Sequence, residues 1–96
     1  MYRVIDTIRC SVEMQQRNPA LWQLGDGLLV ILDPHQIQTA PMTAGSTVRV
    51  SCPDGTVTER SVTSVHVPHS AVGLFFANTE QHEIPRGSQI ELVAAA

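Results

Sequence analysis

One turn signal, Pro53-Asp54-Gly55, separates two stretches in which apolar and polar residues alternate. Proline presets φ for such a turn, aspartate bonds to the nearby backbone, and glycine adopts the left-handed conformation at low cost. Thr47 to Cys52 alternates before the turn, and alternation resumes from Thr56 to Val67 after it. A period of two residues is typical of a strand with one buried face. We therefore predict a β-hairpin at this point.

Four other segments also have the character of strands. Leu28 to Leu32 is an uninterrupted apolar run that follows the tight turn Gly25-Asp26-Gly27, which predicts a strand buried on both faces. The remaining three predicted strands are Val4 to Met14, Ala71 to Phe76 and Ser88 to Val93. Helical periodicity is almost absent. We expect an all-β fold, a small closed antiparallel β-barrel of six or seven strands, forming a single domain over residues 1–96.

The charged residues limit the chemistry of the chain. All six basic residues are arginines, there is no lysine, and nine carboxylates give a formal net charge of -3. Schiff-base chemistry and a phosphate-binding P-loop lysine are therefore excluded. The negative balance predicts no general attraction to nucleic acid or anionic membranes, although a local arginine patch could still grip phosphate.

The apolar runs and the cysteines bear on location. No apolar run has the length of a membrane span, and the N-terminus lacks the apolar core of a signal peptide. Cys10 and Cys52 do not form a CxxC pair, which favours two small buried side chains in a reducing compartment. We expect a cytoplasmic protein with no membrane contact.

The C-terminal third carries the most specific pattern. Val72-Gly73-Leu74-Phe75-Phe76 is followed by Ile84-Pro85-Arg86-Gly87 and then by Ile90. This pattern resembles the Val-x-Gly-Leu-x-Leu strand and the Ile-x-Arg-Gly-x-x-Ile corner in the second domain of translational GTPases, the β-barrel of elongation factor Tu and its relatives. Met42 to Val48 is similar to another segment of that barrel. The chain departs from the family at Ala77-Asn78, where an Arg-Gly pair is common.

The resemblance implies structural roles for Gly73, Ile84, Arg86 and Gly87. Ile84 would plug the barrel end, Gly87 would supply a positive φ, and Arg86 would bind carbonyls or a carboxylate near the turn. In the family, parts of this barrel contact transfer RNA or the ribosome, but those contact residues have no match here. The resemblance therefore implies a barrel used for contacts rather than for chemistry.

No catalytic, metal or cofactor site is predicted, because the chain lacks both the P-loop and the Asn-Lys-x-Asp motif of GTPases. We expect a non-enzymatic, stand-alone module that docks on a protein or ribonucleoprotein partner. The candidate binding residues are Trp22, Arg49, Arg60 and Arg86; Trp22 would serve either as a lid or as a protein-binding anchor.

Two alternatives to this docking module stay open. One is an RNA-binding accessory barrel that uses the same arginines. The other is a small metal or enzyme site built from histidines, with Cys52 as a candidate reactive thiol; the histidines are His35, His66, His69 and His82.

Overall fold

The computed structural model describes residues 2–11, 13, 25–33, 42–67 and 71–95. The expectations for Trp22, His35 and His69 therefore lie outside the described residues. The elements, in chain order, are β1 (Tyr2–Cys10), β2 (Gly27–Leu32), β3 (Thr47–Ser51), β4 (Val57–Ser61), β5 (Ser64–His66), β6 (Val72–Ala77), the 3-10 helix η3 (Gln81–Glu83) and β7 (Gln89–Ala94). Within the described ranges, no helix has the length and apolar content needed to cross a membrane.

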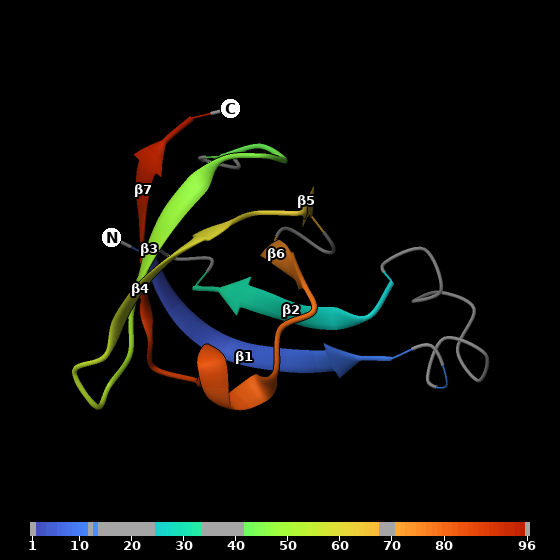
Figure 1. Cartoon of the computed structure of the whole chain (residues 1–96), viewed down its shortest axis with the longest axis horizontal. Coiled ribbons are helices and arrows are strands. Elements are labelled where there is room, and N and C mark those ends of the chain that lie inside the picture. Colours follow the sequence, from blue (N-terminus) through green and yellow to red (C-terminus); the bar gives the residue numbers. More distant parts are fainter. Residues whose placement is uncertain (1, 12, 14–24, 34–41, 68–70, 96) are drawn as a thin grey trace.

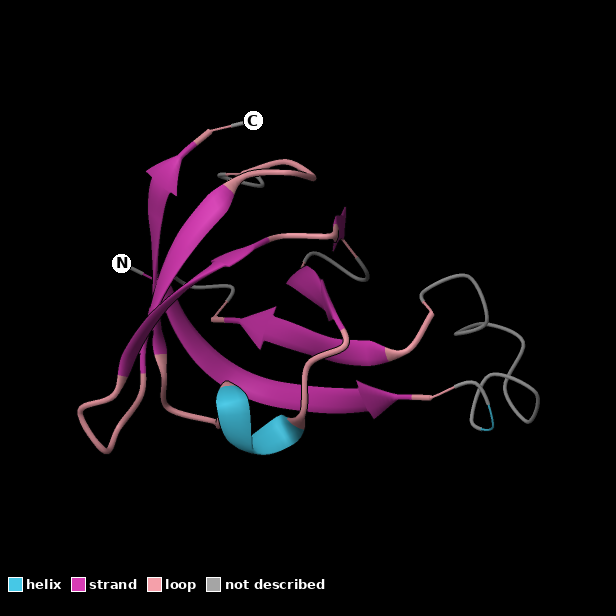
Figure 2. Cartoon of the chain, in the orientation of Figure 1, coloured by secondary structure: helices cyan, strands magenta, loops and turns pink. Residues whose placement is uncertain are grey.

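The strands form one antiparallel sheet in the order β4-β3-β7-β1-β2-β6-β5 (Figures 1 and 2). The all-β prediction is confirmed, and the predicted hairpin is the pairing of β3 with β4. The first predicted strand, Val4 to Met14, is shorter at its C-terminal end than expected, because β1 ends at Cys10. Strands β4 and β5 are the two edges of the sheet, so the strand pairing of the described residues does not close on itself, and the expected closed barrel is not confirmed.

The interior is built from aliphatic side chains on alternating positions. Val48 and Val50 on β3, and Leu28 and Val30 on β2, are completely buried in the main core together with Ile90 of β7. Each such side chain stabilises the fold by roughly 1.5–3 kcal/mol when fully removed from water. The small number of aromatic residues is therefore no obstacle to a packed core.

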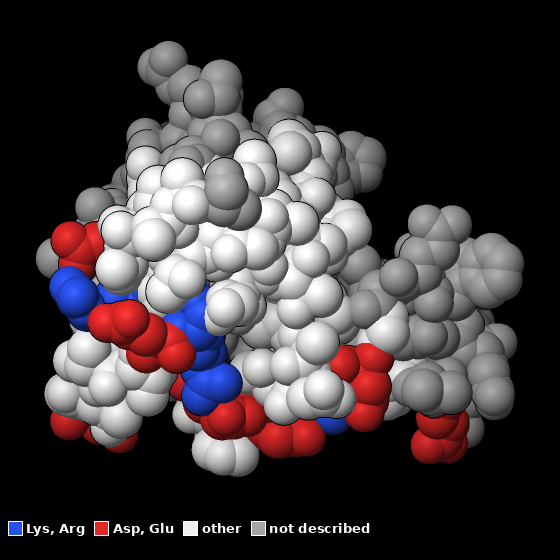
Figure 3. Space-filling view, turned by 45° about the horizontal axis from the view of Figure 1, so that its top comes forward, with Lys and Arg blue, Asp and Glu red and all other residues white. Residues whose placement is uncertain are grey.

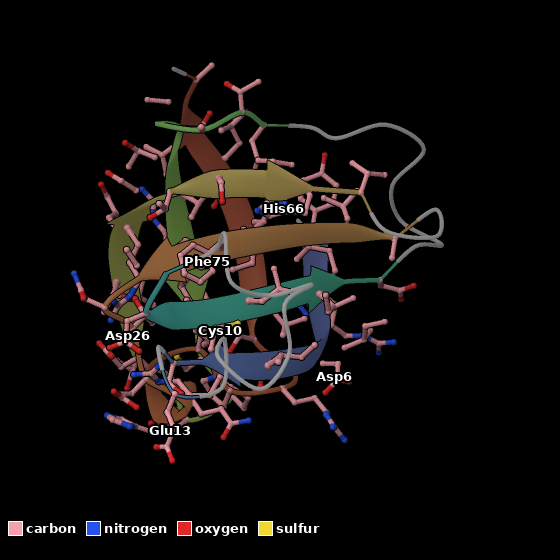
Figure 4. The ribbon with its side chains drawn as sticks, turned by 90° about the vertical axis from the view of Figure 1, so that its right-hand side faces the viewer. Asp6, Cys10, Glu13, Asp26, His66 and Phe75 are labelled. Atoms are coloured by element: carbon pink, nitrogen blue, oxygen red, sulfur yellow. The ribbon has the colours of Figure 1, made fainter. Side chains whose placement is uncertain are left out.

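A second apolar cluster lies on the opposite face of β2. It consists of Cys10, Leu29 and Phe75, with Ile8 and Ile31 packed against it. Leu29 pairs with Phe75 in the register of β2 and β6, while the neighbouring residues of both strands face the main core (Figure 4). The prediction that Leu28 to Leu32 is buried on both faces is confirmed.

The predicted second strand of the hairpin, Thr56 to Val67, is in fact two strands, β4 and β5, that lie at opposite edges of the sheet. The backbone changes partners between them. Val62 donates to the Ser46 carbonyl at 2.9 Å, whereas the next residue, Thr63, donates to the Phe75 carbonyl at 2.8 Å. Val62 therefore bonds toward β3 and Thr63 toward β6. This change of partner interrupts the strand, which the alternating pattern had predicted to be continuous.

Strand β1 contains a β-bulge at Ile5. Val4 pairs with Leu32 and Asp6 with Ile31, so Ile5 is an extra residue in the register. Strand β1 pairs with β7 only before the bulge, at Tyr2 and Arg3, whereas its pairing with β2 extends across the bulge from Val4 to Cys10. A bulge bends the strand that carries it, and β1 curves strongly in Figure 1. This bend joins the two halves of the sheet.

Gly27 is expected to be intolerant of any side chain. A Cβ at this position would lie 2.3 Å from the Phe76 carbonyl oxygen and 2.8 Å from Cζ of Phe75. At Gly73, by contrast, the nearest atoms are the tips of Leu29 and Ile31, at 3.1 and 3.4 Å. We predict that Gly27→Ala lowers the free energy of unfolding by about 1–3 kcal/mol and that Gly73→Ala lowers it less. Urea unfolding measures both, and equal losses would contradict the packing described.

Candidate functional site

The corner between η3 and β7 is fixed by backbone hydrogen bonds to the start of β1. Gly87, at φ 91°, donates from its N–H to the Val4 carbonyl at 2.9 Å, and Val4 donates to the Ser88 carbonyl at 2.9 Å. The Ser88 hydroxyl donates to the Pro85 carbonyl at 2.6 Å. Ile84 is fully buried in the main core. These contacts place Arg86 next to the bulged part of β1.

A depression of about 270 Å³ lies at this corner, lined by Arg3, Val4, Ile5, Arg86 and Gly87. It therefore combines the bulge residue Ile5 with the two sequence-predicted corner residues, Arg86 and Gly87. β-Bulges are common next to functional sites, where they redirect side chains. Among the residues that the structure describes, this corner is the best candidate for a binding site.

Each arginine of the depression has an acidic neighbour. Arg86 Nη2 lies 3.1 Å from Asp6 Oδ1, and these two side chains are 73% and 55% exposed. Arg3 Nη2 lies 3.3 Å from Asp33 Oδ2, which is largely buried. Asp6 projects away from the sheet in Figure 4. An exposed ion pair of this kind is worth roughly 0–1 kcal/mol, so an external anion can replace Asp6 at Arg86 with little loss.

Arg49, predicted as a binding residue, lies between two glutamates. Its guanidinium is 3.6 Å from Glu59 of β4 and 3.4 Å from Glu91 of β7. Arg49 points away from Val48 and Val50, since both valines are buried and the Arg49 side chain is 42% exposed. Arg49 is therefore part of a row of alternating charges across three strands.

Arg60 lies elsewhere. It is opposite the core residue Val48 in the register, and its Nη2 is 2.8 Å from Glu83 Oε1. Arg49 and Arg60 thus project from opposite faces of the sheet, and the structure does not gather Arg49, Arg60 and Arg86 into one patch. Each arginine within the described ranges has a carboxylate within 4 Å; these arginines are Arg3, Arg9, Arg49, Arg60 and Arg86. In Figure 3 the blue surface of the arginines accordingly adjoins the red surface of the carboxylates.

A charge network around Arg9 is the feature that sequence reasoning missed. Arg9 donates to both carboxylate oxygens of Glu80, at 3.0 and 2.9 Å, and to Asp26 at 3.0 Å. It also bonds to the carbonyls of Cys10 and Gly27. Arg9 and Glu80 are 71 residues apart in sequence, so no local pattern connects them.

The network continues through the short helix η3. The Glu80 N–H donates to Glu83 Oε2 at 2.6 Å, and Arg60 binds the other oxygen of Glu83. Hydrogen bonds from Arg9 lower the pKa of Glu80, and hydrogen bonds from the Glu80 backbone and then from Arg60 lower the pKa of Glu83. Charged groups therefore connect β1, η3 and β4 where strand pairing is absent.

The histidines within the described ranges do not converge on a metal site. The His66 ring lies 2.8 Å from the Ser64 hydroxyl on the same strand (Figure 4). His82 is an exposed residue of η3. The described part of the chain contains no group of three or more side chains that could hold a metal ion.

The two thiols are unpaired and differ in environment. Cys10 is completely buried, and this burial raises the pKa of its thiol. Cys52 is only partly buried, and its sulfur lies 3.5 Å from the Glu83 carbonyl oxygen. Cys52 is therefore the more accessible of the two.

Comparisons of the chain with protein-family models, with curated proteins and with solved structures find no match. The resemblance to the translation-factor barrel rests on the motifs Val72 to Phe76 and Ile84 to Ile90, and the candidate site rests on the geometry of the corner.

The carboxylates of the η3 network are expected to make stability depend on pH. A carboxyl group whose pKa is lowered by folding contributes stability above its unfolded pKa and loses it as the pH falls through the folded value. Glu80 and Glu83 should contribute above about pH 4.5 and stop contributing in stronger acid. We predict that Arg9→Gln narrows the difference between urea midpoints at pH 7 and pH 3. Arg49→Gln is the control, and an equal narrowing in both variants would contradict a special role for Arg9.

The thiols give a second prediction. Alkylation with iodoacetamide at pH 8 should modify Cys52 of the folded protein and spare Cys10, because Cys10 is buried and its pKa is raised. Peptide mass spectrometry identifies the modified residue. Urea-unfolded protein, in which both residues should react, is the control. Modification of Cys10 at a rate similar to that of Cys52 would contradict the burial.

Proposed function

We propose that this chain is a non-enzymatic binding module that docks on a protein partner, free or within a ribonucleoprotein, through the corner depression. The observation that supports this most is the state of Arg86. The backbone on either side of it is held by the bonds of the corner, yet its side chain is 73% exposed, and its one ion pair within the described part of the chain is the exposed contact with Asp6. A fixed backbone with an available guanidinium suits the capture of a carboxylate or phosphate on a partner.

The chemistry of the depression favours binding over catalysis. Its lining combines the guanidinium groups of Arg3 and Arg86 with the aliphatic residues Val4 and Ile5. Arginine stays protonated in proteins and donates without accepting. Such a lining suits an anionic group next to an apolar one, as found on a protein surface, and does not provide a base for proton transfer.

The proposal includes a finer description of the fold, a closed barrel of the translation-factor second-domain type. Support comes from the backbone of Val62 and Thr63, which bonds to both halves of the sheet, and from the corner Ile84 to Ile90 that carries the resemblance. The unpaired thiols of Cys10 and Cys52 accord with a reducing compartment. We therefore place the module in the cytoplasm.

Paired arginines count against general RNA binding. A polyanion gains affinity by replacing counterions on unpaired basic groups, but each described arginine already has a carboxylate neighbour. Phosphate recognition would have to occur at the corner, where Arg3 and Arg86 line one depression. RNA binding is therefore an outcome that the test must distinguish.

The test compares partners captured by the wild-type chain and by two variants. Arg86→Gln removes the guanidinium of the corner, and Arg49→Gln removes a similar exposed arginine outside it. We expect Arg86→Gln to reduce capture of a specific protein about tenfold, because charged hydrogen bonds are worth about 1.5–3 kcal/mol, and Arg49→Gln to leave it unchanged.

Each capture is made with and without RNase and read by quantitative mass spectrometry. A partner that survives RNase and depends on Arg86 supports protein docking. Loss of the partner after RNase treatment would indicate that the corner recognises RNA and not a protein. Equal capture by the wild-type chain and Arg86→Gln would contradict the corner as the docking site.

A further inference from the structure

The outer edge of β4 carries backbone groups without a strand partner in the described part of the chain. Cys52 donates to the Thr56 carbonyl and Val62 to the Ser46 carbonyl, so the even-numbered residues of β4 direct their backbone groups toward β3. The odd-numbered residues, Val57, Glu59 and Ser61, must then direct theirs away from β3. Thr63, which is also odd-numbered, directs its N–H away from β3 as well, because this N–H donates to the Phe75 carbonyl of β6. Among the described residues, the edge is thus paired at Thr63 and has no strand partner from Ser61 back to Val57.

The side chains at this edge are accessible and carry a charge pattern. Val57 is 56% exposed, and the side chain of Glu59 is 55% exposed. Across the register Glu59 is opposite Arg49, and Arg49 is opposite Glu91. The row therefore runs negative, positive, negative from β4 to β7, and it ends at Glu59 on the open edge. A strand added beside β4 would continue this alternation with a positive residue next to Glu59.

We propose that the outer edge of β4 binds an extended segment of another polypeptide as an added strand, with a lysine or arginine opposite Glu59. Backbone bonds from Glu59 and Ser61 would supply the affinity, and the charge pair would select the sequence. A second copy of this chain is disfavoured, because antiparallel pairing along the whole of β4 would place Glu59 opposite Glu59. This surface is separate from the corner depression, and the proposal stands whether or not Arg86 binds a partner.

Hydrogen exchange of the free protein tests the geometric premise. The amides of Glu59 and Ser61 should exchange with solvent much faster than those of Thr58, Arg60 and Val62, which face β3. Two-dimensional NMR of the whole chain resolves these amides. Equal protection of both sets would mean that the edge is already occupied, and would overturn the proposal.

The binding test uses three synthetic peptides of sequence Thr-Val-Thr-Xaa-Thr-Val-Thr, with Xaa as lysine, serine or glutamate. We expect the lysine peptide to shift the amide signals of Val57, Glu59 and Ser61 and to bind about threefold more tightly than the serine peptide, as one cross-strand charge pair allows. The glutamate peptide should bind most weakly. The absence of any shift in these amides with all three peptides would overturn the proposal.

Three variants separate the contributions. Ser61→Pro removes an N–H that faces away from β3, where an edge strand tolerates proline, and should abolish peptide binding. Glu59→Lys should invert the preference toward the glutamate peptide, and this result does not depend on the proline variant folding. Arg86→Gln should bind all three peptides like the wild-type chain. An unchanged preference in Glu59→Lys would overturn the proposed role of Glu59, and binding lost in Arg86→Gln would assign the peptide to the corner.

Discussion

Backbone hydrogen bonding at two places in the chain determines how all the other elements are arranged. At Ile5 the bulge bends β1, which pairs with β7 at Tyr2 and Arg3 and with β2 from Val4 to Cys10. At residues 62 and 63 the chain bonds first toward β3 and then toward β6. Each place connects the β3–β4–β7 half of the sheet to the β2–β5–β6 half. The aliphatic core fits between the two halves because both connections are present.

Local patterns were sufficient to predict the parts of the fold that depend on neighbouring residues. The hairpin around Pro53-Asp54-Gly55 and the doubly buried strand β2 follow from turn chemistry and from apolar runs. The division of Thr56 to Val67 into two strands could not be predicted, because it depends on Phe75 as a bonding partner. Helix η3 was missed for a similar reason, since Arg9 and Arg60 hold its glutamates from distant strands.

The candidate site was predicted in part. Arg86 and Gly87 were singled out by a family resemblance, and both line the depression. Arg3 and Ile5 were not singled out, because a bulge leaves no mark in an alternating pattern and the corner approaches β1 only in the folded chain. Arg49 and Arg60 were grouped with Arg86 by residue type, but opposite faces of the sheet and separate glutamate partners keep them apart.

The pairing of β1 with β7 also has a consequence for the order of events during synthesis. Tyr2 pairs with Ile90, and β1 lies in the middle of the finished sheet. A ribosome makes β1 before β7, so the first residues of β1 lack their β7 partner until nearly all of the described chain has emerged. Contacts between distant residues form slowly, and unpaired strands in the interval are prone to aggregation. Tyr2 and Arg3 of the nascent chain therefore stay without this partner until translation brings β7 out of the ribosome.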